Sequence, residues 1–207
     1  MIPLIHNLKG KRVLIFGGGE VGFRKASFFC SEAEITVISR TFCDNLKKMD
    51  VLKIEKDLKS VSDACLLELI SDFAIVVAAT SDRELNNRIG HISKKEKILF
   101  NNADGEEGDI IIPSSIKGKN YLIAISTGGK SPGMSRYIRE HLEDNCPYID
   151  EMIEIQSEIR EILKKTEPDQ RKRNEILHNI LNDDNIQIKL EKNKDSVMKY
   201  IKKEYLQ

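Results

Sequence analysis

The sequence predicts an α/β fold: a doubly wound parallel sheet with helices on both faces, followed by a small β/α segment and a helical C-terminal domain. Two observations predict it. In the first hundred residues, short β-rich runs alternate with segments long enough for crossover helices. All 12 glycines lie at or before Gly133, and the chain after it carries apolar residues at helical spacing.

Five strands are predicted in the alternating part: Arg12–Phe16, Ile35–Ile38, Val51–Glu55, Ala74–Ala79 and Lys97–Phe100. The fourth is apolar throughout, which is typical of a strand buried on both faces. After it, Ser81-Asp-Arg-Glu84 matches a capping box, which predicts that a helix begins just after Thr80–Ser81.

Two further strands are predicted at Asp109–Ile112 and Tyr121–Ile125. Ser131-Pro132 then opens a helix, with serine as the N-cap and proline in the first turn. Apolar residues at helical spacing predict three more helices: Ile149, Met152, Ile153, Ile159, Ile162 and Leu163; Ile176, Leu177, Ile180 and Leu181; Val197, Met198, Ile201 and Tyr205. We therefore divide the chain into residues 1–104, 105–145 and 146–207.

The composition excludes several classes of protein. With 33 basic and 33 acidic residues, the chain lacks the basic excess of a protein that binds nucleic acid through bulk charge. It has no apolar run near the roughly 18 residues that a membrane span needs, and no signal peptide is visible. The four cysteines are widely spaced, without a CxxC pair. We expect a soluble cytoplasmic protein that binds neither nucleic acid nor membrane.

The strongest motif is a glycine turn after the first strand. Gly17, Gly19 and Gly22 fit G-x-G-x-x-G at the start of a helix. The first glycine permits the tight turn, the second lets the backbone approach a pyrophosphate, and the third lets the helix pack on the strand. The motif predicts a dinucleotide at the helix N-terminus in a Rossmann-type domain, against the alternative of a turn kept only for packing.

The end of the second strand leaves the choice of dinucleotide open. The fingerprint expects Asp or Glu about twenty residues on, for the adenosine ribose. Here the strand ends in Ser39-Arg40. Arg40 suits the 2′-phosphate of NADP, but it equally suits stacking on the adenine edge or a position in solvent.

Asp104 follows the fifth strand, at the carboxyl edge where open α/β sheets bind ligands. A carboxylate there could accept a proton or orient a cationic substrate. The alternative is a loop aspartate that caps Gly105.

The segment from Ser126 to Pro132 is the third candidate site. Ser126, Thr127, two glycines, Lys130 and Ser131 precede a helix that carries Arg136 and Arg139. Free N–H groups and nearby cations suit a phosphate or carboxylate ligand. The alternative is an ordinary turn between a strand and a helix.

No resident metal is expected. The four histidines, His6, His91, His141 and His178, form neither HxxH nor HExxH, so each is interpreted as a surface or packing residue. The basic run Arg171–Arg173 is interpreted as a solvated helix start rather than a substrate contact.

Four segments in order make the chain resemble the precorrin-2 dehydrogenase family, the sirohydrochlorin-forming module of siroheme synthases. They are Gly17–Ala26, Ala78–Asp82 with Asn86, Asn102–Asp104, and Ile125–Pro132 with Arg136. The resemblance covers about residues 1–145. Ser81 departs from the aspartate frequent in the family, which should change the helix cap but not the chemistry.

The resemblance implies oxidation of precorrin-2 to sirohydrochlorin with transfer of a hydride to NAD, and it favours NAD over NADP at Arg40. It implies a functional role for Asp104. Some members also insert ferrous iron, so a ferrous or cobaltous ion is a possible substrate and lyase activity stays open. The implied cofactor contacts are Gly17, Gly19, Glu20, Val21, Gly22, Arg40, Thr41 and Thr80. The expected substrate contacts are Ser126, Thr127, Lys130, Ser131 and Arg136.

The resemblance also implies a homodimer in which residues 105–145 form the interface, with strands Ile110–Ile112 and Leu122–Ile125 facing the partner. The helical tail would cover the substrate cleft. Two other functions are kept as alternatives: another Rossmann NAD(P) oxidoreductase, and a non-enzymatic sensor of dinucleotides. Such sensors typically use an acidic residue after the second strand, where this chain has Ser39-Arg40.

Overall fold

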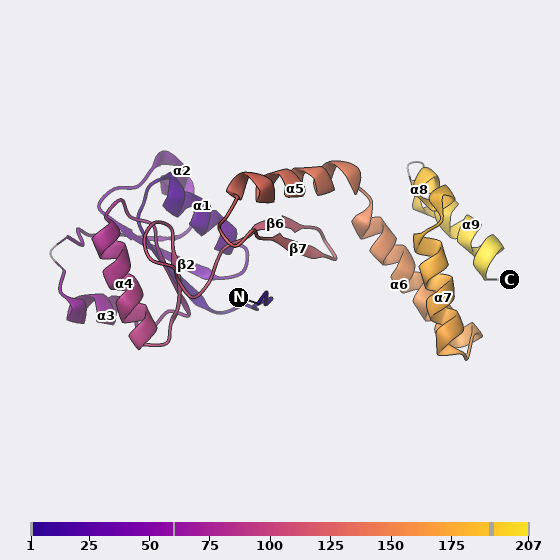
Figure 1. Cartoon of the computed structure of the whole chain (residues 1–207), viewed down its shortest axis with the longest axis horizontal. Coiled ribbons are helices and arrows are strands. Elements are labelled where there is room, and N and C mark those ends of the chain that lie inside the picture. The colour runs from indigo at the N-terminus through magenta and orange to yellow at the C-terminus, as the bar shows by residue number, and fades with distance from the viewer. Residues whose placement is uncertain (1, 60, 191–192, 207) are drawn as a thin grey trace. The chain divides into compact units, whose positions relative to one another are not determined.

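The computed structural model describes residues 2–59, 61–190 and 193–206. They form two compact units, Met1–Ile112 and Pro113–Gln207 (Figure 1). In the described ranges, no helix is long and apolar enough to cross a membrane.

The first unit is a Rossmann-type α/β domain, which confirms the predicted fold class. Its five parallel strands lie in the order β3-β2-β1-β4-β5. The elements are β1 Arg12–Phe16, α1 Glu20–Phe29, β2 Glu34–Ser39, α2 Asp44–Lys48, β3 Leu52–Glu55, α3 Asp63–Ile70, β4 Ile75–Ala78, α4 Arg83–Lys95 and β5 Leu99–Asn102. The strand order reverses between β1 and β4, and ligands bind outside the carboxyl ends of strands at such a point.

Apolar side chains on both faces of the sheet hold this unit together. Leu14 and Phe16 of β1 pack on one face with residues of α3 and α4. Val13 and Ile15 pack on the other face with residues of α1 and α2. Because both faces are covered, all four residues of β4 are buried.

Two predicted boundaries in this unit are wrong. The fifth strand begins at Leu99, two residues later than predicted, because Lys97 has a φ of 58° and turns the chain. The N-cap of α4 is Asp82 rather than Ser81: its side chain accepts a hydrogen bond from the Leu85 N–H at 3.0 Å.

The strand predicted at Asp109–Ile112 is also wrong. Ile110 and Ile112 pack against the sheet of their own unit. The Ile110 carbonyl accepts a hydrogen bond from Asn101 Nδ2 at 2.9 Å, which fixes this stretch beside β5. Pro113 follows, and strand β6 begins only at Ser114.

The second unit begins with an antiparallel pair of strands, β6 Ser114–Lys117 and β7 Leu122–Ile125. Helix α5, Pro132–Asn145, packs on both strands. The predicted helix start is confirmed, since the Ser131 side chain caps α5 by accepting a hydrogen bond from the Met134 N–H.

Four helices complete the second unit: α6 Ile149–Thr166, α7 Gln170–Leu181, α8 Asp184–Leu190 and α9 Lys194–Tyr205. They bury a common apolar core, so the predicted helical tail is confirmed. Helix α8 was not predicted, because its seven residues are too few for a clear periodicity. Ile155 is fully buried although it lies outside the predicted apolar face, and Leu181, which was placed in it, is 49% exposed.

The turn of the β6–β7 hairpin is fastened to α6. Asp150 accepts hydrogen bonds from the N–H groups of Lys119 and Asn120, at 2.8 and 2.7 Å. One turn further on, Glu154 pairs with Lys119 at 2.9 Å and with Lys194 of α9 at 3.0 Å. Hydrogen bonds from these two lysines, with their charges, lower the pKa of Glu154 to about 2.

We expect Glu154→Gln to remove part of the acid sensitivity of the second unit. The depressed pKa means that the carboxylate stabilises the fold fully above pH 4.5, and that this contribution is lost as the pH falls toward 2. Since the carboxylate lies at the surface, with its side chain 35% exposed, the effect on the melting temperature is small. Melting curves between pH 2 and 7 should show wild type and variant converging at low pH. Glu158→Gln, one turn along α6, is the matched control, and an equal effect there would contradict the prediction.

Candidate functional site: the cavity at the glycine turn

The chain leaves β1 through a turn that only glycine accommodates at its first position. Gly17 has a φ of 116°, in the left-handed half of conformational space. Its N–H donates to the Ile38 carbonyl at 2.9 Å, and a Cβ on Gly17 would overlap the Ala79 carbonyl oxygen. The turn is therefore wedged between the ends of β2 and β4.

The N-terminus of α1 is open where a dinucleotide pyrophosphate would lie. Its N-cap is Gly19, and no side chain among the described residues caps the free N–H groups of the first turn. A Cβ on Gly19 would meet no atom within 4 Å, whereas one on Gly22 would overlap the Gly17 carbonyl oxygen. The second glycine thus leaves room for a ligand and the third allows close packing, so the turn fits NAD.

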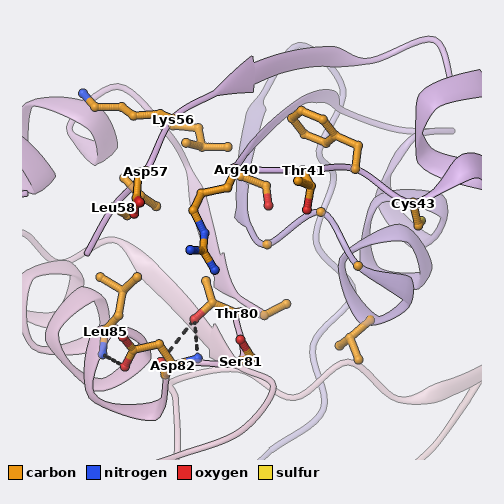
Figure 2. A pocket seen from close by; sticks show the side chains of 18 of the residues that line it. Arg40, Thr41, Cys43, Lys56, Asp57, Leu58, Thr80, Ser81, Asp82 and Leu85 are labelled. Carbon is orange, nitrogen blue, oxygen red and sulfur yellow. Dashed lines mark hydrogen bonds between the residues drawn. The ribbon is translucent and has the colours of Figure 1, made fainter. Parts of the chain in front are cut away.

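A cavity of about 630 Å³ lies at this edge of the sheet (Figure 2). It is lined by the carboxyl ends of strands β1, β2 and β4 and by the chain that follows β3. Seven of the eight predicted cofactor residues line it: Gly17, Gly19, Glu20, Val21, Arg40, Thr41 and Thr80. Gly22 lies outside the lining, behind the turn that it packs against.

Arg40 directly follows β2 and places an exposed positive charge at this cavity. Its side chain extends across the cavity toward Thr80 in Figure 2. In the described part of the chain, its guanidinium has no ion-pair partner. It is therefore available to a ligand in the cavity, and its expected contact with the cofactor stays a prediction.

Thr80, two residues after β4, is held by the Asn86 side chain of α4 and by the main chain of Asp82. Its hydroxyl lies 2.6 Å from Oδ1 of the buried Asn86, and its oxygen accepts from the Asp82 N–H at 3.1 Å (Figure 2 shows the Asp82 contact). Asn86 Nδ2 donates to the carbonyl oxygens of Thr80, at 3.0 Å, and Asp104, at 3.2 Å.

Asp104 lies on the loop after β5, at the same carboxyl edge of the sheet. Its main chain is fixed by Asn86 and by a hydrogen bond from its own N–H to Asn102 Oδ1 at 3.3 Å. Its exposed carboxylate has no hydrogen-bond or ion-pair partner among the described residues. An anchored main chain with an unengaged carboxylate suits a group that acts on a ligand.

The predicted anion-binding loop belongs to the second unit. Gly128 and Gly129 have φ values of 61° and 78°, which makes the tight turn before α5. The Thr127 hydroxyl accepts from the Ser131 N–H at 3.0 Å and lies 3.1 Å from the Ser131 carbonyl. The Ser126 and Ser131 hydroxyls accept from the N–H groups of Gly128 and Met134. These hydroxyls therefore shape the loop.

The two basic residues at this loop differ in their surroundings. Lys130 is exposed and has no ion-pair partner within the described ranges. Arg136 is paired with Glu140 of the same helix face at 2.7 Å, and this pair raises the Arg136 pKa. Lys130 is thus the more available cation.

Within residues 2–59, 61–190 and 193–206, no group of three or more His, Cys, Asp or Glu side chains is arranged to hold a metal ion.

Comparison with known proteins decides the family. Residues 4–114 match the family model described as "Putative NAD(P)-binding". The precorrin-2 dehydrogenase of Methanosarcina barkeri is 39% identical over 190 residues, which cover 89% of this chain and 84% of that protein. The chain belongs to the precorrin-2 dehydrogenase family. Residues 123–145, which contain the anion-binding loop Ser126–Pro132 (the serine loop), match a second model, for the central part of sirohaem biosynthesis proteins.

Two further members extend the likeness to almost the whole chain. A Methanocaldococcus jannaschii protein named "Putative precorrin-2 dehydrogenase" is 32% identical over 199 residues, covering 93% of this chain and 95% of that one. The solved structure of SirC, a precorrin-2 dehydrogenase, has a TM-score of 0.72 at 26% identity and covers 98% of this chain and 100% of its own. The likeness to precorrin-2 dehydrogenases therefore includes the helical tail.

Sequence reasoning missed two parts of this precorrin-2 dehydrogenase site. The chain after β3, from Lys56 to Lys59, lines the cavity beside Arg40. The third predicted strand was the available signal, because parallel strands all end at the same edge of the sheet. Asn86 was noticed only as part of a motif, and its contacts became visible only in the fold.

Proposed function

We propose that this chain oxidises precorrin-2 to sirohydrochlorin with NAD, in siroheme biosynthesis. One observation carries the proposal: the open cavity at the glycine turn and the unengaged carboxylate of Asp104 share one edge of the sheet, in a member of the precorrin-2 dehydrogenase family. Neither a non-enzymatic sensor nor an unrelated oxidoreductase would require both the loop that carries Asp104 and the serine loop.

The oxidation removes a hydride and a proton from the macrocycle. NAD, when bound, supplies the hydride acceptor. The residues of the chain bind and orient the reactants, with pyrophosphate at the free N–H groups of α1 and adenosine near Arg40 and Thr41. A carboxylate oxygen of Asp104 accepts the proton.

The substrate is an anion with eight carboxylates, which explains the choice of contacts in the second unit. Lys130 and Arg136 would hold carboxylates by charge, with the N–H groups near Ser131. Ser126 and Thr127 would act by shaping this loop, since their hydroxyls already bond within it. Residues 146–207 would cover the substrate.

The test of this function is direct. Incubating the protein with precorrin-2 and NAD should produce sirohydrochlorin and NADH in equal amounts, both followed by absorbance. NADP in place of NAD should support a lower kcat/KM. If sirohydrochlorin formed neither with NAD nor with NADP, the proposal would be contradicted.

Metal insertion is tested separately, with ferrous or cobaltous ion as a substrate. If the chain also acts as a chelatase, sirohydrochlorin with either ion, in the absence of NAD, gives metallated product faster than the same mixture without protein. Asp104 is the carboxylate that both reactions would use, so Asp104→Ala is the informative variant there too.

We also propose that two copies pair through residues 105–145, by way of the β6–β7 hairpin and α5, because Ile110 and Ile112, which were expected to face the partner, pack on the sheet of their own unit. The two-stranded sheet has open edges, and Leu122, Met134 and Tyr137 near it are 47%, 48% and 59% exposed. Exposed strand edges with apolar side chains invite pairing with another chain. Light scattering coupled to size exclusion should give twice the chain mass, and a monomer at micromolar concentration would contradict the pairing.

A further inference from the structure

Asn86 is a fully buried polar residue inside helix α4. Asparagine is a weak helix former, and burial of its carboxamide is costly unless every hydrogen-bonding position finds a partner. A buried asparagine at this position therefore indicates that its hydrogen bonds have a function that an apolar side chain could not provide.

The carboxamide of Asn86 has four contacts. Oδ1 accepts from the Thr80 N–H at 3.3 Å and from the Thr80 hydroxyl at 2.6 Å. Nδ2 donates to the Thr80 carbonyl at 3.0 Å and to the Asp104 carbonyl at 3.2 Å. All donors and acceptors of the side chain are therefore used, and all of them go to the chain just after β4 and just after β5.

These contacts join the two segments that hold the proposed cofactor contact and the proposed proton acceptor. A main-chain hydrogen bond from Ala103 to Ala78, at 2.9 Å, holds the strands together up to this point. Beyond it, the Asn86 carboxamide is the buried link between Thr80 and Asp104. Breaking it would remove a donor from two part-buried carbonyl oxygens, so the link favours a fixed separation of the two residues.

We propose that Asn86 is a positioning residue for the oxidation, an inference that rests on the proposed function. It fixes the main chain of Asp104 relative to Thr80, so that the carboxylate meets the macrocycle while the cofactor lies against the end of β4. It acts through Asp104 and does not itself touch the substrate.

The test is a double-mutant cycle with Asp104→Ala. Asn86→Ala and the isosteric Asn86→Asp each remove the donors to the two carbonyl oxygens. Each should lower kcat roughly 10- to 100-fold, because displacements of about 1 Å have effects of this size. In the Asp104→Ala background the same changes should lower kcat less than about threefold, since the group they position is gone.

Asn87→Ala is the matched control. Asn87 is the next residue of α4 and binds the farther part of the same loop, accepting from the Glu106 N–H at 3.0 Å. It should lower kcat several-fold less than the Asn86 changes. Melting curves and NAD titrations identify the variants that fold. If Asn86→Ala does not fold, Asn86→Asp replaces it in the cycle, because the aspartate side chain fills the space of the asparagine and leaves no cavity.

Three results are distinguishable. A wild-type protein that forms no sirohydrochlorin overturns the proposed function and this inference with it. An active wild type whose folded Asn86 variants keep full kcat, or lose as much kcat with Asp104→Ala as without it, overturns the inference alone. A loss of kcat that occurs when Asp104 is present and disappears in the Asp104→Ala background supports it.

Discussion

Asp104→Ala should lower kcat for precorrin-2 oxidation by about 10²- to 10⁴-fold, the range for loss of a positioned proton acceptor. The affinity for NAD should stay within about threefold of wild type, because the Asp104 side chain lies outside the lining of the glycine-turn cavity. The fold should tolerate the change, since the carboxylate is exposed and the contacts of this residue are made by its main chain.

Single-turnover formation of NADH measures the chemical step directly, and a separate titration gives the NAD dissociation constant. Asp109→Ala is the matched control, an exposed aspartate five residues further along the same loop. It should leave both quantities unchanged. Equal turnover in wild type and Asp104→Ala would remove Asp104 from the mechanism, and equal losses in both variants would show a disordered loop instead.

The sheet could be predicted because its signals are local. A parallel strand covered on both faces is apolar throughout, as β4 is, and the glycine turn fixes where β1 ends and α1 begins. The errors fall where tertiary contacts override local pattern. The positive φ of Lys97 shortens β5, and Asn101 holds Ile110 beside the sheet although its sequence is typical of a strand.

The site could be predicted as far as strand order places residues. Arg40, Thr80 and Asp104 follow three different strands, and the carboxyl ends of parallel strands meet at one edge. Side-chain partners could not be predicted in the same way. The spacing of the serine loop indicates hydroxyls near a helix start, but not that Thr127 bonds to Ser131. Asn86 in a sequence is one more polar helix residue, and only the fold reveals what it joins.

The same substitution at two glycines of one motif should give opposite results. Gly22→Ala should destabilise the first unit, since the new Cβ would overlap the Gly17 carbonyl oxygen, backbone against backbone. We expect a loss of about 3 kcal/mol or more in the free energy of unfolding. This corresponds to a fall of roughly 6 to 12 °C in the melting temperature.

Gly19→Ala should instead leave the melting temperature within about 3 °C of wild type. The backbone of Gly19 is extended, with φ −81° and ψ −172°, and the added methyl group meets no protein atom within 4 Å. That space is where a pyrophosphate would approach the free N–H groups of α1, so the methyl group should weaken NAD binding. A misfit of about 1 to 3 kcal/mol corresponds to roughly a 5- to 150-fold higher dissociation constant.

Melting curves and NAD titrations on both variants separate the two roles. If Gly19→Ala bound NAD as tightly as wild type, the pyrophosphate would not lie at this helix start, and the cavity would need another ligand. If instead both variants lost stability equally, the motif would serve packing alone, which is the alternative that the glycine spacing left open. If Gly19→Ala keeps its fold but binds NAD weakly, one methyl group has blocked the NAD site. This result would place NAD in the cavity without any measurement of turnover.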